Sequence, residues 1–227
     1  MRVLVSLVRP IALSVGVIAF MTLSHGSARA DEVTLAGYTN GCFNCAPAAV
    51  PNIIGTQTAP LLGLSYTNSQ FNDTTFFGNL GFGGNPTPTG IQNVNNFGSF
   101  TLANSTGVYA GNAFTLRVTF NLPTGISGGS SQLYTATLLG AVSSTGTGGV
   151  NIDFNNTPQV FTFSNANGSG SFTLTIHDVA INPGQTASLD AFITSAQQTT
   201  LPEPTGMILL GTGLIGVVAL VRRIKRN

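Results

Sequence analysis

The only two cysteines of the chain, Cys42 and Cys45, stand three positions apart in the stretch "NGCFNCAP". This spacing can serve a metal ion or a redox reaction. A structural zinc site needs four ligands, and the chain has no second cysteine pair and no histidine cluster. The motif also lacks the strand-then-helix context of a thioredoxin-like site. We therefore expect Cys42 and Cys45 to form a local disulfide, which an oxidising compartment preserves.

His177 and Asp178 are adjacent and could seed a catalytic dyad. Successive residues of a strand point to opposite faces, so these two side chains cannot readily bond each other. The other carboxylates of the middle region are spread along the chain: Asp31, Glu32, Asp73, Asp153 and Asp190. They form a poor set for paired-carboxylate glycoside hydrolysis. Asp153 and Asp190 are most simply outward-facing residues, and the alternative is that they are Ca²⁺ ligands. We expect no catalytic group, no cofactor and no metal site in this chain.

The composition limits the partners of the chain. Of its 227 residues, 42% are hydrophobic and only 7% are charged, which favours a folded core over disorder driven by charge. Arg117 is the only basic residue between Asp31 and Leu201; the other seven lie near the two ends. Nucleic-acid binding requires a basic surface, and this region has none, so we expect no nucleic-acid partner.

The middle of the chain predicts strands that would position these side chains. In "NAFTLRVTFNL" apolar and polar residues alternate, which is typical of a strand with one buried face. The residues expected on its buried face are Phe114, Leu116, Val118, Phe120 and Leu122. Those expected on the opposite face are Thr115, Arg117, Thr119 and Asn121. The segments "GSFTLTI" and "TASLDAFITS" repeat the pattern, and their expected inward residues are Phe172, Leu174, Ile176, Leu189, Ala191 and Ile193.

Weaker strand signals lie between turn-forming Gly, Pro and Asn residues. The segments that carry them are "VTLAGY", "LLGLSYT", "TTFFGNL", "GSFTLAN", "QLYTATLLGAV", "GVNIDF" and "QVFTFS". "HDVAINPGQTASLDAF" further suggests a strand, a tight turn and a returning strand. About ten short strands at this spacing predict an all-β fold, an antiparallel β-sandwich over residues 31–198.

Residues 68–104 are rich in Gly, Asn and Phe. They form either a ligand-binding rim or irregular connections whose Phe side chains anchor in the core. Both alternatives agree with the composition, because Gly and Asn favour turns whereas Phe favours burial.

The first thirty residues predict a secretory signal peptide. Arg2 and Arg9 supply the positive start, and residues 11–23 supply the apolar region. Ala28 and Ala30 form the small-x-small pattern that precedes a cleavage site. A retained membrane anchor is the alternative. We expect cleavage after Ala30 and a protein that begins at Asp31.

The C-terminal region combines three features in order. Pro202, Glu203 and Pro204 hold the chain extended, since a residue before proline avoids the helical region. The stretch from Met207 to Val221 is apolar and would span about 22 Å as a helix, less than the roughly 30 Å hydrocarbon core. Basic residues come directly after it: Arg222, Arg223, Lys225 and Arg226. The positive-inside rule keeps that end in the cytoplasm and the preceding chain outside.

This arrangement resembles the PEP-CTERM sorting signal, which has a Pro-Glu-Pro motif, a transmembrane stretch and an Arg-rich tail. The resemblance covers about the last 27 residues, here 199–227 with the approach to the motif, and the body resembles no family we recognise. It implies recognition by exosortase, a membrane-embedded cysteine transpeptidase of bacteria that make exopolysaccharide. It further implies secretion, transient anchoring of Met207 to Val221 in the inner membrane, and release or attachment at the cell surface.

Three classes of function agree with these observations. We expect a non-enzymatic exported surface or extracellular-matrix protein, associated with exopolysaccharide or biofilm. A carbohydrate-binding module is the alternative, but such modules stack sugars on exposed aromatic rings, and the chain has no Trp. Its tyrosines are Tyr38, Tyr66, Tyr109 and Tyr134. A secreted hydrolase is the least supported class, given the few carboxylates and histidines.

Overall fold

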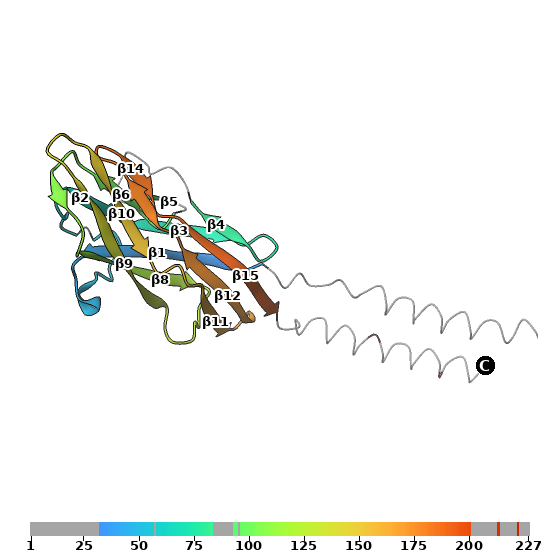
Figure 1. Cartoon of the computed structure of the whole chain (residues 1–227). Coiled ribbons are helices and arrows are strands. Elements are labelled where there is room, and N and C mark those ends of the chain that lie inside the picture. Colours follow the sequence, from blue (N-terminus) through green and yellow to red (C-terminus); the bar gives the residue numbers. More distant parts are fainter. Residues whose placement is uncertain are drawn as a thin grey trace, which may run out of the picture. The chain divides into compact units, whose positions relative to one another are not determined.

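The computed structural model describes residues 32–56, 58–83, 93–94 and 96–200, together with the single positions 213 and 222. These residues are organised almost wholly as strands (Figure 1), and the described helical content of the body is one 3-10 turn, η1 (Pro47–Ala49). The predicted signal peptide, the motif at Pro202 to Pro204 and nearly all of the segment after it lie outside the described residues. Among the described residues, no helix has the length and apolar character needed to cross a membrane.

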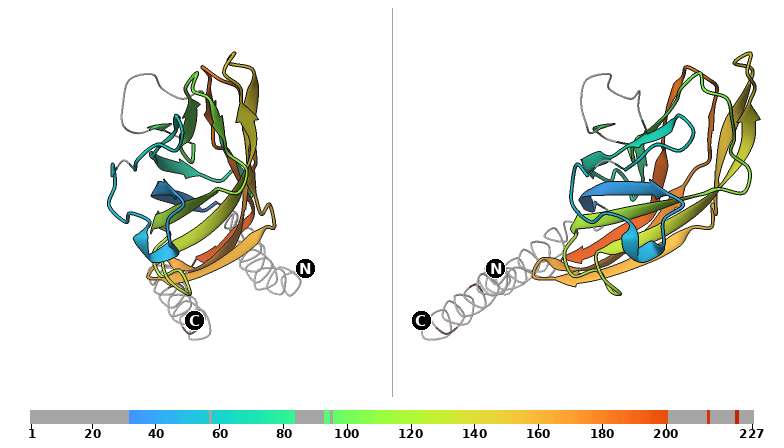
Figure 2. Two further views of the ribbon diagram at one scale, coloured as in Figure 1. Left: turned by 60° about the vertical axis from the view of Figure 1, so that its left-hand side comes forward. Right: turned by 90° about the vertical axis from the view of Figure 1, so that its left-hand side faces the viewer.

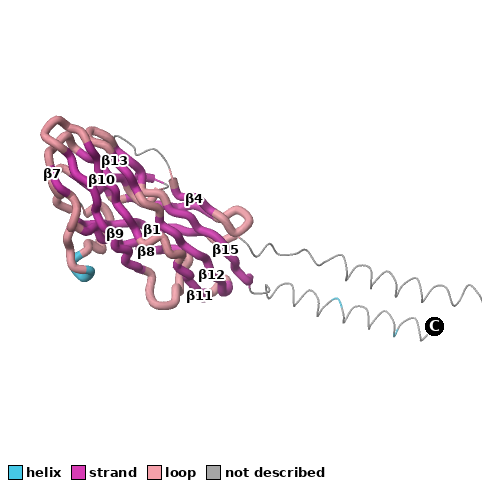
Figure 3. The backbone as a smooth tube through the Cα atoms, viewed as in Figure 1, coloured by secondary structure: helices cyan, strands magenta, loops and turns pink. Residues whose placement is uncertain are grey.

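The largest sheet contains eight strands, and every pair in it is antiparallel except β3 with β5. Its strands, in spatial order, are β13 (Val179–Ile181), β10 (Gly148–Phe154), β9 (Ser131–Val142), β8 (Ala113–Leu122), β1 (Thr34–Phe43), β3 (Ser69–Thr74) and β5 (Asn93–Val94), with β7 (Gly107–Val108) paired to β9. Figure 3 shows β7, β9 and β10 close together at one end of the body. The long central strands β1, β8 and β9 form the middle of this sheet.

Two smaller sheets complete the body. One has four strands in the order β11 (Gln159–Asn165), β12 (Gly168–Ile176), β15 (Ala191–Thr200) and β4 (Leu80–Phe82). The other has three strands in the order β14 (Thr186–Ser188), β6 (Ser99–Leu102) and β2 (Leu64–Thr67). Only Leu189 and Asp190 separate β14 from β15, so the two small sheets are joined directly along the chain.

Both small sheets pack against the same face of β8. Near one end of that strand the ring of Phe114 lies 4.9 Å from the rings of Tyr66 and Phe100 in the three-stranded sheet. Towards the other end the ring of Phe120 lies 5.2 Å from that of Phe172 in the four-stranded sheet. The strands therefore enclose one continuous apolar core. The ribbon views of Figure 2 show the curved arrangement of these strands, which is consistent with a β-sandwich or a half-barrel. The prediction of an antiparallel all-β fold is confirmed at this level.

The alternation predicted for β8 holds for four of its five apolar residues. Phe114, Leu116, Val118 and Phe120 are buried, but Leu122 is 42% exposed. The cause is a bulge: Gly37 of β1 pairs with Phe120 and Ala36 pairs with Leu122, which leaves Asn121 as an extra residue. A single extra residue reverses the face of every residue beyond it. The expected burial of Leu122 is therefore wrong.

The second face of β8 is less exposed than the alternation suggests. Thr115 and Thr119 are only 5% and 7% exposed. Arg117, which lies between them, donates hydrogen bonds from Nη2 to the carbonyl oxygens of Pro47 and Val50, both at 3.3 Å. The segment after β1 thus folds back over this face. Because this segment covers the second face, β8 is buried on both sides. An alternating sequence pattern alone does not predict such a strand.

Two other predicted segments differ from the structure. "TTFFGNL" is a turn between β3 and β4, with Phe76 and Phe77 outside any strand. The segment from His177 to Phe192 does contain the two expected strands, but β13 pairs with β10 whereas β14 pairs with β6. These strands join different sheets, so they do not form a hairpin.

Candidate functional site

Cys42 and Cys45 are joined by a disulfide with a Cα–Cα distance of 5.9 Å. Cys42 is buried in β1, and Cys45 lies just after the strand. Between them, Asn44 has a φ of 53° and its side-chain Oδ1 accepts a hydrogen bond from the Ala113 amide at 2.9 Å. The disulfide therefore closes a tight bend that is also held by hydrogen bonds to the start of β8. This geometry is that of a structural link at the base of the segment covering β8.

His177 and Asp178 are engaged separately. The ring of His177 stacks on that of Phe192 at a centroid distance of 4.8 Å and an interplanar angle of 25°. The carboxylate of Asp178 accepts a hydrogen bond from the amide of Phe154 at 2.9 Å. The side chains thus serve different contacts, as expected for successive residues at the end of a strand.

Among the described residues, no carboxylate group is hydrogen-bonded to the His177 side chain as a triad would require. Asp73 accepts a hydrogen bond from the amide of Thr74, and Asp153 is exposed on β10. Asp190 contacts the His177 segment through its backbone, because its carbonyl oxygen accepts the His177 amide at 3.1 Å. Within the described part of the chain, no group of three or more His, Cys, Asp or Glu residues is placed to hold a metal ion.

The tyrosines do not form a sugar-stacking surface. Tyr66, Tyr109 and Tyr134 are 1%, 0% and 6% exposed and belong to the core. Tyr38 is half-buried, and its hydroxyl donates to the carbonyl oxygen of Asn52 at 3.1 Å. The exposed aromatic rings of the described body are instead phenylalanines: Phe76 at 67%, Phe77 at 55% and Phe192 at 44%. All three lie on β15 or on the turn that leads into β4.

A groove of about 540 Å³ lies on the outer face of the four-stranded sheet, beside this turn. Val160 of β11 lines one side and is 70% exposed, whereas Phe77 lines the other. Between them, Ser171 and Thr173 of β12 and Gln197 of β15 present polar groups. The alternation of β12 explains this placement, because Phe172 and Leu174 point into the core and the alternate residues, Ser171 and Thr173, lie on the outer face.

The turn that carries Phe77 has an unusual residue at its first central position. The amide of Phe76 donates to the carbonyl oxygen of Asn79 at 2.8 Å, and the amide of Asn79 donates back at 3.1 Å. The two residues between them, Phe77 and Gly78, have φ angles of 49° and 72°. Turns with two positive φ values normally use Asn, Asp or Gly, because the left-handed region costs other residues roughly 1–2 kcal/mol. Phe77 bears this cost although most of its surface is exposed.

A second residue of the groove is also in the left-handed region. Ser195 has a φ of 53° and lies at a bulge in β15. Thr173 pairs with Thr194 and Ser171 pairs with Gln197, so Ser195 and Ala196 together face Phe172. Ala196 is buried and Ser195 lines the groove. Bulges often redirect side chains next to functional sites, and non-glycine residues with positive φ gather at such sites.

Reasoning from the sequence does not find this groove. The apolar residues of "TTFFGNL" favour a strand and outweigh the turn signal of Gly78 and Asn79. The bulge at Ser195 has no signal, because its sequence continues an ordinary strand pattern. Gly78 and Asn79 are a turn signal, but residue preference does not place Phe77 at the first central position of that turn.

The groove has the size of a small-molecule or oligomer site, combines apolar sides with polar groups between them, and contains no charged lining residue. It can bind a neutral ligand that has both apolar faces and hydrogen-bonding groups. Comparison with known proteins adds no relative to this description: the chain matches no protein-family model, no curated protein and no solved structure.

Proposed function

We propose that this chain is an exported, non-enzymatic protein of the cell surface or extracellular matrix. In this proposal residues 1–30 are a signal peptide, residues 31–198 form an antiparallel β-sandwich body, and residues 199–227 are a sorting signal. The support is the order of sequence features: a positive and apolar start, a β-rich body poor in charge, a Pro-Glu-Pro motif, an apolar stretch and a basic tail.

The observation that carries the proposal is how closely the body approaches the motif. Strand β15 stays paired with β12 to its last residue, where Thr200 pairs with Gly168 and Thr199 pairs with Ser169. Pro202 comes after one intervening residue. The sheet thus includes Thr199 and Thr200, two residues beyond the predicted end of the body at residue 198, and reaches almost to the motif. A motif that follows a folded body so directly supports a separate role for it.

That role is recognition by an exosortase-type transpeptidase after the secretion machinery has moved the body across the inner membrane. The stretch from Met207 to Val221 halts in the bilayer, and the basic tail that begins at Arg222 stays in the cytoplasm. The Pro-Glu-Pro motif then lies at the outer boundary of the membrane, extended by its prolines. The thiolate of the enzyme attacks a backbone carbonyl carbon near the motif, the amide bond breaks, and the part of the chain that follows it leaves with a new, protonated amino terminus. The thioester that joins the body to the enzyme is then resolved by water or by an amine acceptor.

The body takes part as a binding or structural module. Its one histidine outside the predicted signal peptide, His177, stacks on Phe192, and Asp178 is held by the Phe154 amide, so both side chains have structural contacts. A carbohydrate-binding module associated with exopolysaccharide is the second candidate. The observation that favours it is the exposed ring of Phe77 beside the polar face of β12 and β15.

The proposal is tested by the mass of the surface-localised protein in a host that carries the sorting enzyme. The wild type should begin at Asp31 and should lack Arg222 and the residues after it. Glu203→Ala should retain the whole tail while export and folding continue, and Asp153→Ala, a matched change at an exposed carboxylate of the body, should be processed normally. Surface protein that keeps residues 222–227 in the wild type would show a permanent anchor and would refute sorting.

A further inference from the structure

Phe77 and Ser195 are strained residues that face the same groove. Of the non-glycine residues with positive φ among those described, these two line it, at φ angles of 49° and 53°. Phe and Ser do not favour a positive φ angle, which Gly, Asn and Asp adopt more readily. Burial does not compensate Phe77, since its ring is 55% exposed. The ring of Phe77 packs edge-on against that of Phe76, at a centroid distance of 4.3 Å, and this contact holds it beside the groove. Strained non-glycine residues gather at functional sites, so the presence of both Phe77 and Ser195 on one groove marks that groove as a candidate binding site.

The position of Phe77 suits a ring-stacking contact. Its turn bonds to β15 through Gly78 and Ala196, and Val160 lines the same groove from β11, at the far edge of the sheet. Between these apolar sides, the Gln197 amide donates to the Ser171 hydroxyl at 3.3 Å. A serine hydroxyl that accepts one bond keeps its own proton to donate, and the Gln amide keeps its carbonyl oxygen as an acceptor. The groove thus offers an aromatic face and both kinds of hydrogen-bonding group.

A second exposed ring lies farther along the same face. Phe192 pairs with Thr175 across β12 and β15, one outward position beyond the pair of Thr173 with Thr194. Outward positions of one strand are about 7 Å apart, so this ring extends the binding face beyond the groove. Its stacking on His177 fixes its orientation. Two oriented rings on one face suit a chain of repeating units better than a single small molecule.

The charge of the surroundings restricts the ligand. None of the groove-lining residues is charged, and Arg117 is the only Lys or Arg between residues 32 and 200. A nucleic acid, an anionic lipid surface or an acidic polysaccharide would need basic partners. A neutral sugar ring carries apolar C–H faces that stack on aromatic rings, and hydroxyls that bond to Ser, Thr and Gln.

We infer that this groove binds a neutral polysaccharide, with Phe77 and Phe192 stacking on its sugar rings and Ser171, Thr173 and Gln197 bonding to its hydroxyls. The inference rests on the proposed export, since such polymers surround cells on their outer side. It assigns a class of ligand to the non-enzymatic body and places the binding surface on the outer face of the four-stranded sheet.

The test uses the protein purified as it is exported, applied to one array of neutral and acidic glycans. Wild-type protein should bind neutral glycans. Phe77→Asn should weaken this binding about tenfold or more, the effect expected for a central aromatic contact. Its melting temperature should stay equal or rise, because Asn tolerates the positive φ of this turn. Loss of binding without loss of stability cannot be attributed to unfolding.

Phe76→Asn is the matched control. Phe76 is the adjacent exposed phenylalanine and does not line the groove, but its ring contacts that of Phe77 at a centroid distance of 4.3 Å. This variant should therefore lose clearly less binding than Phe77→Asn, about threefold at most, because the ring of Phe77 itself remains. Val160→Thr, which keeps a β-branched side chain in β11, should weaken binding several-fold by removing the opposite apolar side. Equal losses in the Phe76 and Phe77 variants would contradict the inference and indicate insertion of the whole turn into another surface.

Three further results would overturn the inference. They are no binding to any neutral glycan, binding to acidic glycans alone, and binding of wild-type protein to phosphatidylcholine–phosphatidylglycerol vesicles that both Phe variants lose. The mass of the same preparation shows whether the tail has been removed. Failure of the groove inference and failure of the sorting proposal are thereby read from separate measurements.

Discussion

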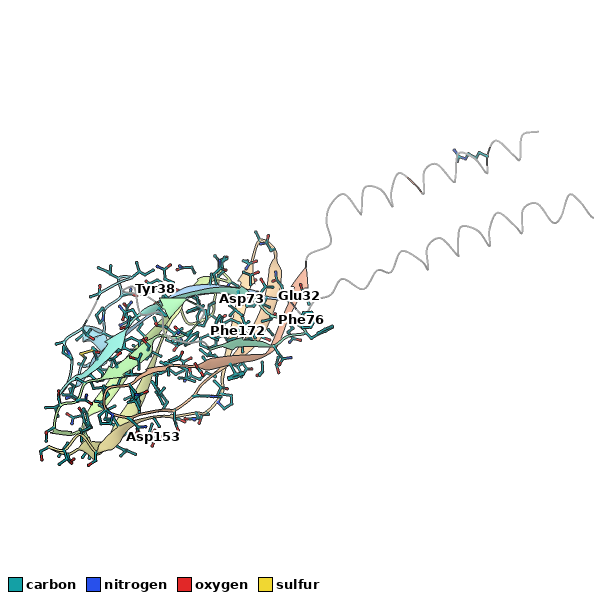
Figure 4. All side chains as sticks on the ribbon, turned by 90° about the horizontal axis from the view of Figure 1, so that it is seen from above. Glu32, Tyr38, Asp73, Phe76, Asp153 and Phe172 are labelled. Carbon is teal, nitrogen blue, oxygen red and sulfur yellow. A yellow bond between two sulfur atoms is a disulfide. The ribbon has the colours of Figure 1, made fainter. Side chains whose placement is uncertain are left out.

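The amide of Ala196 donates a hydrogen bond to the carbonyl oxygen of Gly78 at 2.9 Å. This bond joins the turn that presents Phe77 to the bulge that presents Ser195. Figure 4 places Phe76, the first residue of that turn, beside Glu32, and the Thr75 amide correspondingly bonds to the Val33 carbonyl oxygen at 3.0 Å. The turn is thus held from both sides, by the first strand region and by the last strand.

The coupling between turn and bulge can be measured with two glycines. Gly78 and Gly146 have φ angles of 72° and 74°, but a Cβ on Gly78 would lie 2.7 Å from the Ala196 carbonyl oxygen, whereas a Cβ on Gly146 meets nothing within 4 Å. Gly146→Ala should cost about 1–2 kcal/mol from backbone strain alone. Gly78→Ala should cost clearly more in urea denaturation, because the carbonyl group must also move. Equal costs would show that turn and bulge are not tightly coupled.

The register of β12 gives a second prediction. Phe172 is fully buried and contacts the rings of Phe161 and Phe120 at 4.9 and 5.2 Å. Phe172→Ala should therefore lower the free energy of unfolding by about 3–5 kcal/mol, the usual cost of deleting a buried aromatic ring. Thr173→Ala, on the outer and half-buried face, should cost less than about 1 kcal/mol. Similar costs at the two positions, measured by chemical denaturation, would mean that both faces of the strand are core.

Much of the fold could be predicted from the sequence because its strands alternate strongly. The alternate apolar residues from Phe114 to Phe120 in β8 and from Phe172 to Ile176 in β12 are buried as expected. Leu122 departs from its predicted face because a bulge at Asn121 depends on pairing with β1, which is a long-range relationship. The burial of Thr115 and Thr119 depends on a segment that folds back from another part of the chain. Local patterns carry no information on either event.

The groove is harder to predict than the strands for a different reason. Its sides come from Val160 and Phe77, which are 83 positions apart and are brought together by the order of strands in one sheet. The position of Phe77 also contradicts the residue preference of its turn, so a method based on preferences assigns it elsewhere. The resemblance to a sorting signal, in contrast, could be recognised because its three parts are contiguous.

Arg117 should hold the segment after β1 in place. Its Nη2 atom donates to the carbonyl oxygens of Pro47 and Val50. Arg117→Met keeps much of the alkyl packing but removes the guanidinium donor from both carbonyl groups, of which that of Pro47 keeps the Val50 amide at 3.4 Å, so we expect a loss of about 1–3 kcal/mol. Amide exchange should accelerate selectively at Ala49, Val50 and Thr56, whose amides are hydrogen-bonded within this segment. Unchanged exchange there would show that the disulfide and other bonds suffice.

Two buried tyrosines differ in the partners of their hydroxyls. The Tyr66 hydroxyl donates to the carbonyl oxygen of Phe97 at 2.6 Å and contacts Thr39 Oγ1 at 2.8 Å. The Tyr134 hydroxyl is buried and has no hydrogen-bond partner among the described residues. Tyr66→Phe should therefore cost about 1–3 kcal/mol at pH 8, whereas Tyr134→Phe should be neutral or stabilising, because removing an unpaired buried hydroxyl ends its desolvation cost.

The same pair gives a pH dependence with a defined sign. Burial raises the pKa of Tyr66 and of Tyr134, since the charged phenolate is poorly solvated in the core. Above about pH 10, the unfolded chain releases these protons while the folded chain retains them. Stability is thus fully present below pH 10 and falls as pH rises, by up to about 1.4 kcal/mol per pH unit for each tyrosine. Each Tyr→Phe variant lacks one of the two titrating hydroxyls, so its stability should fall less steeply above pH 10 than that of the wild type. From pH 8 to pH 11, Tyr66→Phe should therefore become less destabilising and Tyr134→Phe more stabilising. Denaturation midpoints of wild type and both variants at the two pH values measure this change, and parallel pH profiles would show that neither hydroxyl is desolvated as its burial indicates.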